Sequence, residues 1–263
     1  MSDDRFWYLA TEGHARKTGI QRLRVSLESA LGAKEAAAIS FTGLETSASA
    51  VHALAADLAA GLALADRSVL LIDLDFDRPS SLPEFGSGAS VASLLRQLED
   101  EEIEDTVSHI KLVLNEQREV LPGLRGMRAG QGLEDSADAL AGWRLQELLN
   151  QAKASADVVV VVGPEASHPT SQELSHRVDG VVLVCTAGKT TLPMIERTVR
   201  ELNTRRASLL GIVLTSPPRL LGRLLRARKR SDRGVGRNLS VSSTKAKRRR
   251  SARHDEGLGE ARL

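Results

Sequence analysis

The sequence predicts an α/β fold with a mostly parallel β-sheet and helices on both faces. Residues 157–162 and 180–185 are near-continuous runs of valine, which are typical of strands buried on both faces of a parallel sheet. Segments of this kind alternate along the chain with longer helix-like segments, as in repeated βαβ units. The core is expected to be aliphatic, because hydrophobic residues make up 41% of the 263 residues and aromatic residues only 3%.

The expected elements follow from apolar periodicity and from residue type. Helices are expected over residues 17–32, 50–65, 91–98, 143–152 and 190–203. Strands are expected over residues 36–41, 68–72, 157–162, 180–185 and 208–214. A segment of threonine, serine and glycine, residues 42–49, follows the first strand and is expected to form a loop before the second helix.

Charge is distributed unevenly and indicates the domain organisation. Residues 219–253 have 14 Lys and Arg against one acid, Asp232, a balance of +13, while residues 1–218 have a balance of −9. The composition changes after Pro217 and Pro218. We expect an N-terminal extension over 1–16, one α/β domain over 17–217 and a basic, largely disordered tail over 218–263.

Cysteine content and hydropathy indicate the cellular compartment. Cys185 is the single cysteine, so no internal disulfide can form, and a reducing cytoplasm suits the chain. No signal peptide is recognised at the acidic N-terminus, and no apolar run approaches the ~20 residues that span a bilayer. We expect a cytoplasmic protein that contacts the inner face of the cell membrane only peripherally. Cys185 lies in an apolar strand and is interpreted as a core residue.

Seven motifs occur in a fixed order along residues 17–217. They are 21–27 (QRLRVSL), 69–80 (VLLIDLDFDRPS), 82–86 (LPEFG), 120–123 (VLPG), 156–164 (ADVVVVVGP), 179–190 (DGVVLVCTAGKT) and 210–214 (LGIVL). Their order and spacing resemble the bacterial tyrosine autokinases of capsule and exopolysaccharide synthesis (the CpsD/CapB type). These kinases belong to the MinD/ParA-like superfamily of P-loop proteins.

The resemblance implies several properties of the chain. The fold would be P-loop NTPase-like, and any cofactors would be ATP and Mg²⁺. The partner would be a membrane protein of chain-length control or export (a Wzz-like co-polymerase), and the protein would also form homo-oligomers. Its function would be to regulate capsular or exopolysaccharide synthesis or export.

The segment in the place of the phosphate-binding loop has lost its main features. A working loop needs glycines for close backbone approach to phosphate and a lysine that reaches the β- and γ-phosphates. This segment has one glycine, Gly43, and the chain has no lysine between Lys34 and Lys111. Glu45 adds a carboxylate, which repels a phosphate ~4 Å away by several kcal/mol at a near-surface dielectric.

Some side chains suited to a nucleotide remain around this segment. If Ala48 occupies the lysine position, Ser49 takes the position of the hydroxyl that binds Mg²⁺. Vestigial nucleotide contacts would then come from Gly43, Thr46, Ser47, Ser49 and Arg78. Vestigial catalytic carboxylates would be Asp73 and Asp75, and the metal would be held by Asp73 and Ser49.

Two further departures favour a structural interpretation of these residues. Val162 stands where the family has its Walker B aspartate, and Tyr8 is the single tyrosine, so the family's tyrosine cluster is missing. In the structural interpretation, Asp73 caps a strand end and Asp75 forms a local ion pair with Arg78. We favour this interpretation, because two carboxylates alone bind Mg²⁺ weakly without a substrate phosphate.

Residues 188–190 (GKT) look like the end of a phosphate-binding motif. A phosphate-binding motif would need a second glycine five residues before Gly188. That position is occupied by Leu183, within an expected strand. We therefore interpret this segment as a strand-to-helix turn with Thr190 or Thr191 as the helix N-cap. The six histidines show no metal-ligand spacing.

Residues 219–230 form an amphipathic segment within the basic tail. Leu220, Leu221, Leu224 and Leu225 fall on one helical face, and arginines including Arg223 and Arg226 take the other. This pattern is typical of a segment that binds an anionic membrane surface. A solvated tail without a specific partner is an alternative, and nucleic acid is favoured less because the tail has no aromatic residue to stack on bases.

Three functional hypotheses remain open. The first is a degenerate, non-catalytic regulator that resembles the tyrosine autokinases. The second is an active ATP-dependent protein-tyrosine autokinase that uses an unrecognised loop. The third is a positioning or partitioning ATPase of the MinD/ParA type.

Overall fold

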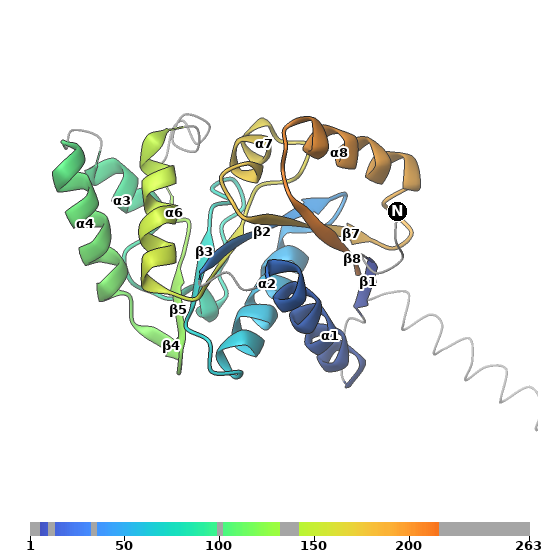
Figure 1. Ribbon diagram of the computed structural model, residues 1–263, viewed down its shortest axis with the longest axis horizontal. Coiled ribbons are helices and arrows are strands. Elements are labelled where there is room, and N and C mark those ends of the chain that lie inside the picture. Colours follow the sequence, from blue (N-terminus) through green and yellow to red (C-terminus); the bar gives the residue numbers. More distant parts are fainter. Residues whose placement is uncertain (1–5, 10–13, 33–35, 99–101, 132–141, 216–263) are drawn as a thin grey trace, which may run out of the picture. The chain divides into compact units, whose positions relative to one another are not determined.

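The computed structural model (Figure 1) describes residues 6–9, 14–32, 36–98, 102–131 and 142–215. Within these residues, eight strands form one sheet in the order β1-β8-β7-β2-β6-β3-β5-β4. Their bounds are β1 Phe6–Leu9, β2 Ala37–Leu44, β3 Val69–Asp73, β4 Glu119–Leu121, β5 Leu124–Met127, β6 Val158–Val162, β7 Gly180–Thr186 and β8 Leu209–Thr215. All neighbouring pairs are parallel except β4 and β5, which form a short antiparallel hairpin.

Helices cover both faces of this sheet, and in Figure 1 α1 and α2 lie below it while α7 and α8 lie above. Their bounds are α1 His14–Leu31, α2 Ala48–Ala63, α3 Val91–Gln97, α4 Ile103–Glu116, α6 Trp143–Ser155, α7 Pro169–Ser175 and α8 Leu192–Thr204, with a 3-10 turn, η2, at Pro83–Phe85. Successive residues of a strand point to opposite faces. Thus Val160 of β6 packs with α1 and α2, whereas Val159 packs with α3, α4 and α6.

The fold class predicted from the sequence is confirmed, because the sheet is mostly parallel and has helices on both faces. One expected boundary is wrong. The loop expected over 42–49 is mostly regular structure: β2 continues to Leu44, and α2 begins at Ala48. The reason is tertiary, since residues 42–44 continue the parallel pairing with β7, up to the pair of Leu44 with Cys185.

Several elements were not predicted from the sequence. Residues 6–9, expected within an N-terminal extension, form β1 and pair in parallel with β8. The other unpredicted elements are α4, α7 and the β4–β5 hairpin, in which each strand is short. The domain boundary expected at residues 217 and 218 and the basic tail lie outside the described residues. None of the described helices is both long and apolar enough to cross a membrane.

Candidate functional site

The candidate site lies where β2, β3, β6 and β7 end. Because these strands are parallel, their carboxyl ends meet at one edge of the sheet, where α/β proteins of this class bind ligands. The register brings Asp73 opposite Val162, and Val162 opposite Phe41 on the other side. The sequence-predicted residues that follow these strands are therefore neighbours in space.

The end of β2 and the loop before α2, residues 42–47, are bonded to the rest of the protein, and the β2 part is bonded through its carbonyl groups. The Gly43 carbonyl accepts from the Ala166 amide (2.8 Å), and the Leu44 carbonyl accepts from the Thr190 hydroxyl (2.9 Å). A phosphate-binding loop instead turns its N–H groups inward around the anion. Gly43 is buried in a paired strand, so it is not part of an open anion-binding loop.

Hydroxyl groups hold the same segment from two sides. The Thr42 hydroxyl donates to the Pro164 carbonyl (2.6 Å) and lies 3.0 Å from the Ser171 hydroxyl of α7. On the other side, the Thr186 hydroxyl donates to Thr46 Oγ1 (2.6 Å). Thr46, a predicted nucleotide contact, is thus buried and engaged with β7.

The first turn of α2 is capped by the protein itself. Ser47 is the N-cap, and its Oγ accepts from the Ala50 amide at 3.3 Å. The Ser49 hydroxyl donates to Ser47 Oγ at 3.2 Å. A bound anion satisfies the free amides of a first turn in P-loop proteins, whereas here Ser47 satisfies one of them. Ser47 and Ser49, both predicted as site residues, are brought together by this cap.

Asp73 is fully buried, and its carboxylate is bonded within the protein. Oδ1 accepts from the Asp75 amide at 3.0 Å and lies 3.2 Å from His52 Nε2, and Oδ2 accepts from the Ser80 amide at 2.7 Å. Since a carboxylate can only accept, the His52 ring nitrogen must be the donor. These contacts order the turn that follows β3. Asp73, which the sequence offered as a metal ligand, therefore acts as a structural residue.

Asp75 is also buried and forms the ion pair with Arg78 that the structural interpretation predicts. Arg78 Nη2 lies 3.2 Å from Asp75 Oδ2, and the Arg78 amide donates to Asp75 Oδ1. Burial raises the pKa of Asp75 above its ordinary value, and the neighbouring Asp73 raises it further, whereas Arg78 and His52 oppose the shift. Arg78 is half-exposed and also approaches Glu165 Oε2 at 3.6 Å.

Glu165 links the ends of three strands. Its Oε1 accepts from the Glu45 amide at 3.3 Å, and its Oε2 faces Arg78. A carboxylate of the protein therefore takes the backbone N–H and the cation that a bound phosphate would need. With Glu45 alongside, two carboxylates and one guanidinium lie at the carboxyl ends of β2, β3 and β6.

These residues do not fit ATP with Mg²⁺. The segment lacks a lysine and is closed by hydrogen bonds, Asp73 has no exposed oxygen, and Val162 offers no ligand. Among the described residues, no three His, Cys, Asp or Glu side chains are grouped so that they could hold a metal ion. The hydrogen bonds and ion pairs of these residues instead hold together the loops that follow β2, β3, β6 and β7.

The GKT segment is a turn, as predicted. β7 ends at Thr186, Gly188 has a positive φ of 79°, and α8 begins after Thr191 as its N-cap. The Thr191 side chain makes no capping hydrogen bond, whereas Thr190 bonds back to β2 and to Thr186. Cys185 is confirmed as a core residue, and burial raises its pKa to about 12.

Sequence analysis missed two residues that organise the site. His52 was one of six histidines without a pattern, and its partner Asp73 is 21 residues away in the chain. Nothing in the immediate sequence of Glu165 indicates its link to Glu45, 120 residues earlier. Only the pairing of β2, β3 and β6 brings these groups together. The predicted membrane-binding residues, 220–226, lie outside the described residues.

Comparison with known proteins confirms the resemblance to bacterial tyrosine kinases. No family model matches the chain. The chain is 27% identical over 164 residues to a protein of Ralstonia nicotianae assigned as the tyrosine-protein kinase EpsB, a match covering 62% of this chain and 21% of that protein. The chain thus spans about a fifth of the length of that relative.

Solved kinase domains share the fold. The kinase domain of the Escherichia coli tyrosine kinase ETK superposes with a TM-score of 0.63 and 22% identity over 77% of this chain and 76% of that one. The chimerical protein CapA2B2 gives a TM-score of 0.65 with 16% identity over 80% and 92% of the two chains. The BceF tyrosine kinase domain gives a TM-score of 0.60 with 23% identity over 78% of each of the two chains. At these identities the structures establish the fold alone.

Proposed function

We propose that this chain, a relative of the bacterial tyrosine kinases, is a non-catalytic regulator that has kept the kinase fold and lost the nucleotide site. The observation that carries the proposal is the state of Asp73. Its carboxylate is buried and already bonded to two backbone amides and to His52. Freeing it for Mg²⁺ would require breaking these bonds in the interior, where an unsatisfied polar group costs about 1–3 kcal/mol.

The end of β2 and the loop before α2, residues 42–47, support the same proposal. A nucleotide would need Gly43 and Leu44 to leave the pairing with β7 and to break the bonds that their carbonyl groups accept. The negatively charged phosphates of the nucleotide would also be repelled by the carboxylates of Glu45 and Glu165. Opening this segment for a nucleotide would break several hydrogen bonds at once. No single side chain therefore keeps the segment closed.

Equilibrium titration of the full chain with ATP and Mg²⁺ tests this proposal. We expect no binding tighter than about 1 mM, the weak end of the affinity scale. An Ala48→Lys variant, which restores the missing lysine, should still fail to bind, because the segment remains bonded to β7 and to α7. A low-micromolar dissociation constant for the parent chain would overturn the proposal and favour an active autokinase.

Autophosphorylation gives a second test of the enzymatic alternative. Tyr8 is the single tyrosine, so a family-type tyrosine cluster cannot be modified. We expect no phosphotyrosine after incubation with ATP and Mg²⁺. Phosphorylated Tyr8 that disappears in the Asp73→Ala variant would not fit the proposal, provided that the variant is shown to be folded.

The proposed biological role is to regulate capsular or exopolysaccharide synthesis or export, in contact with a membrane chain-length or export protein at the inner face of the cell membrane. The resemblance to the tyrosine autokinases supports this role. The MinD/ParA-type alternative can be separated genetically: glycosyltransferase and export genes beside this gene favour the first role, and partition genes favour the other. Loss of the gene should then change polysaccharide chain length or yield, with chromosome segregation unaffected.

A further inference from the structure

A cavity of about 590 Å³ lies at the β4 end of the sheet. Its walls are the loop that joins η2 to α3 and the corner that joins α4 to β4, together with Gly126 of β5. Figure 1 shows β4 and β5 at this end of the sheet, below α4. The cavity lies within the usual size range of small-molecule sites, about 300–1,000 Å³, and none of its lining residues belongs to the crevice around Asp73.

Glycine residues form the wall of this cavity on the side of β5. A Cβ atom at Gly86 would collide with the carbonyl oxygen of Gly126, and a Cβ atom at Gly126 would collide with the carbonyl oxygen of Glu84. Gly86 also has a φ of 71°, a conformation that favours glycine. The loop after η2 therefore rests directly on β5, and this wall of the cavity is backbone held in one position.

The loop over residues 87–89 has its carbonyl groups bonded to the protein. The Arg128 guanidinium donates to the Ser87 carbonyl at 3.1 Å and to the Gly88 carbonyl at 3.4 Å, and Gln117 Nε2 donates to the Ala89 carbonyl at 3.3 Å. The C=O and N–H groups of a trans peptide point in opposite directions, so the N–H of Gly88 points away from Arg128. Within the described part of the chain, this N–H makes no hydrogen bond. It is therefore a donor available to a ligand.

Gln117 contributes a buried acceptor to the cavity. The residue is only 5% exposed, and its Nε2 donates to the Val113 carbonyl at 3.2 Å as well as to Ala89, so both amide hydrogens are used. These two bonds fix the amide plane, and Oε1 lies beside Gly88, 2.5 Å from where a Cβ atom would be. Among the described residues, Oε1 accepts no hydrogen bond. Because a buried acceptor without a partner is costly, it marks the place of a donor group from a ligand.

The charges around the cavity cancel. Glu116, Arg118 and Glu119 line it and are exposed, and Arg128 lies behind the loop, bonded to the Ser87 carbonyl. Two carboxylates thus stand against two guanidinium groups, so neither an anion nor a cation gains a net attraction. A carboxylate can only accept hydrogen bonds and a guanidinium can only donate them. The cavity therefore offers donors and acceptors together, without a net charge.

We propose that this cavity binds a small uncharged polyhydroxylated molecule, a monosaccharide. A hydroxyl group both donates and accepts, so neighbouring hydroxyls of one sugar ring can donate to Gln117 Oε1 and accept from the Gly88 N–H and from Arg118. An ionised phosphate or carboxylate cannot donate to Gln117 and is repelled by Glu116 and Glu119, whereas an ammonium group cannot accept from Arg118. The proposal depends neither on the closure of the nucleotide site nor on the proposed regulatory role.

The test uses the full chain labelled with ¹⁵N and titrated with D-glucose, D-galactose or N-acetyl-D-glucosamine. At least one of these sugars should bind with a dissociation constant of about 1–10 mM and should shift the NMR signals of the Gly88 backbone amide and the Gln117 side-chain amide. Inorganic phosphate and putrescine, which carry opposite charges, should bind more weakly than this sugar. No shift with any of the three sugars, or binding of phosphate or putrescine as tight as that of the sugar, overturns the proposal.

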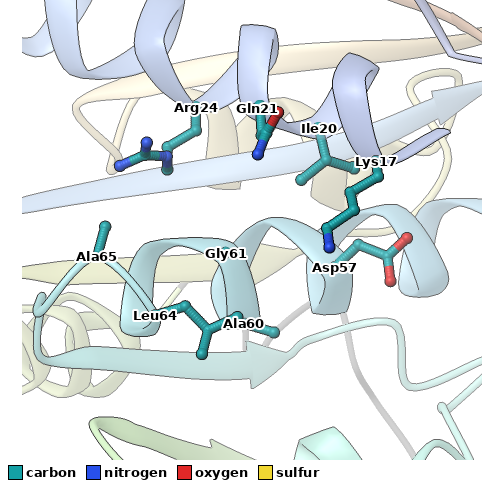
Figure 2. A pocket seen from close by; sticks show the side chains of 9 residues that line it. All are labelled: Lys17, Ile20, Gln21, Arg24, Asp57, Ala60, Gly61, Leu64 and Ala65. Carbon is teal, nitrogen blue, oxygen red and sulfur yellow. The ribbon is translucent and has the colours of Figure 1, made fainter. Parts of the chain in front are cut away.

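Variants locate the bound sugar in this cavity. Gly88→Ala places a methyl group against Gln117 Oε1, and Arg118→Ala removes an exposed donor without touching the core, so each should weaken the sugar at least about fivefold. The matched control is Arg24→Ala, which removes the same charge from a different cavity, the groove between α1 and α2 (Figure 2), and should leave the affinity unchanged. If Arg118→Ala binds the sugar as well as the parent does, or if Arg24→Ala weakens it equally, the cavity beside β4 is not the site.

Discussion

His52 Nε2 lies 3.2 Å from Asp73 Oδ1 in the interior between α2 and the end of β3. Both side chains are almost completely buried, and the His52 ring also packs edge-to-face on Phe85 of η2, with centroids 5.5 Å apart. The pair therefore ties a helix, a strand end and the following turn together. In the proposed function, this contact has replaced metal binding as the role of Asp73.

Replacing Asp73 by alanine should destabilise the fold. The substitution leaves the amides of Asp75 and Ser80 and the ring of His52 without their acceptor in the interior. We expect a loss of about 3 kcal/mol in the free energy of unfolding, because each buried hydrogen-bonding group that loses its partner costs about 1–3 kcal/mol. Urea denaturation followed by circular dichroism measures it.

Asp77 provides the matched control for Asp73. Its side chain is 57% exposed, and its carboxylate lies 3.7 Å from His168 Nε2. Asp77→Ala should change the free energy of unfolding by less than about 0.5 kcal/mol, as is usual for surface substitutions. If both variants are as stable as the parent, Asp73 is not the structural residue described above.

The buried Asp75 should make stability depend on pH in a definite direction. Its pKa is raised above 3.8, chiefly by burial, so the folded chain holds this proton more tightly than the unfolded chain. The resulting contribution to stability is fully present below the ordinary pKa and is lost as the pH rises through the raised pKa. Asp75→Asn removes this dependence. The stability of the variant minus that of the parent should therefore increase from about pH 3.5 to about pH 7.

Urea titrations of both proteins at several pH values measure this difference. Titrating groups that do not face Asp75 affect parent and variant alike, so the difference reports Asp75 together with the neighbours coupled to it, Asp73 and His52. A difference that falls with pH would mean that the Arg78 ion pair outweighs burial and lowers the pKa of Asp75.

The sheet could be predicted from the sequence because its strands are strongly marked. The valine runs that form β6 and β7 have few alternatives to a buried parallel strand. The end of β2 could not be predicted, since Thr42 and Gly43 favour a loop locally and become a strand only through pairing with β7. Strand β1, with four residues, carries too short a pattern to be recognised.

The candidate site was predictable only in part. Asp73, Asp75 and Arg78 follow a strand in a recognisable motif, so their proximity was expected. Their partners come from elsewhere: His52 from α2 and Glu165 from the turn after β6. These contacts depend on strand order, which periodicity does not specify. The missing lysine alone did not indicate that residues 42–47 would be hydrogen-bonded to β7 and α7.

Cys185 should be unreactive in the folded protein. It is fully buried in β7, and burial raises its pKa to about 12, so the thiolate that attacks electrophiles is scarce at neutral pH. We expect no labelling by iodoacetamide under native conditions and complete labelling in urea. Rapid native labelling at a rate independent of urea would contradict the buried position.

Arg125 of β5 should stabilise the ends of two helices. Its guanidinium donates to the Leu114 carbonyl of α4 at 3.0 Å and to the Ser155 carbonyl of α6 at 2.6 Å. Arg125→Met keeps much of the apolar stem and removes the charged hydrogen bonds, each worth about 1.5–3 kcal/mol. Urea denaturation should show a loss of at least about 2 kcal/mol, whereas Arg118→Met, at an exposed position, should leave stability nearly unchanged.

Binding of the basic tail to membranes is predicted from its sequence. Residues 219–230 contain four leucines on one helical face and six basic residues. Inserting the leucines at the headgroup boundary contributes at most ~1.5–3 kcal/mol each, and the charges add an attraction that salt screens over ~8–10 Å. We expect reversible binding of the full chain to anionic vesicles and weak binding to neutral ones, because the two contributions are needed together.

Substitutions in the tail separate insertion from simple charge attraction. Leu221→Glu with Leu225→Glu should abolish vesicle binding in a sedimentation assay while every basic residue is kept. Leu239→Glu with Val241→Glu makes the same change of charge in the tail but outside the amphipathic segment, so it should lower binding only slightly. If both double variants lose binding equally, charge alone governs the interaction and the amphipathic interpretation is wrong. If the parent binds duplex DNA more tightly than vesicles at about physiological ionic strength, the partitioning alternative becomes the better hypothesis.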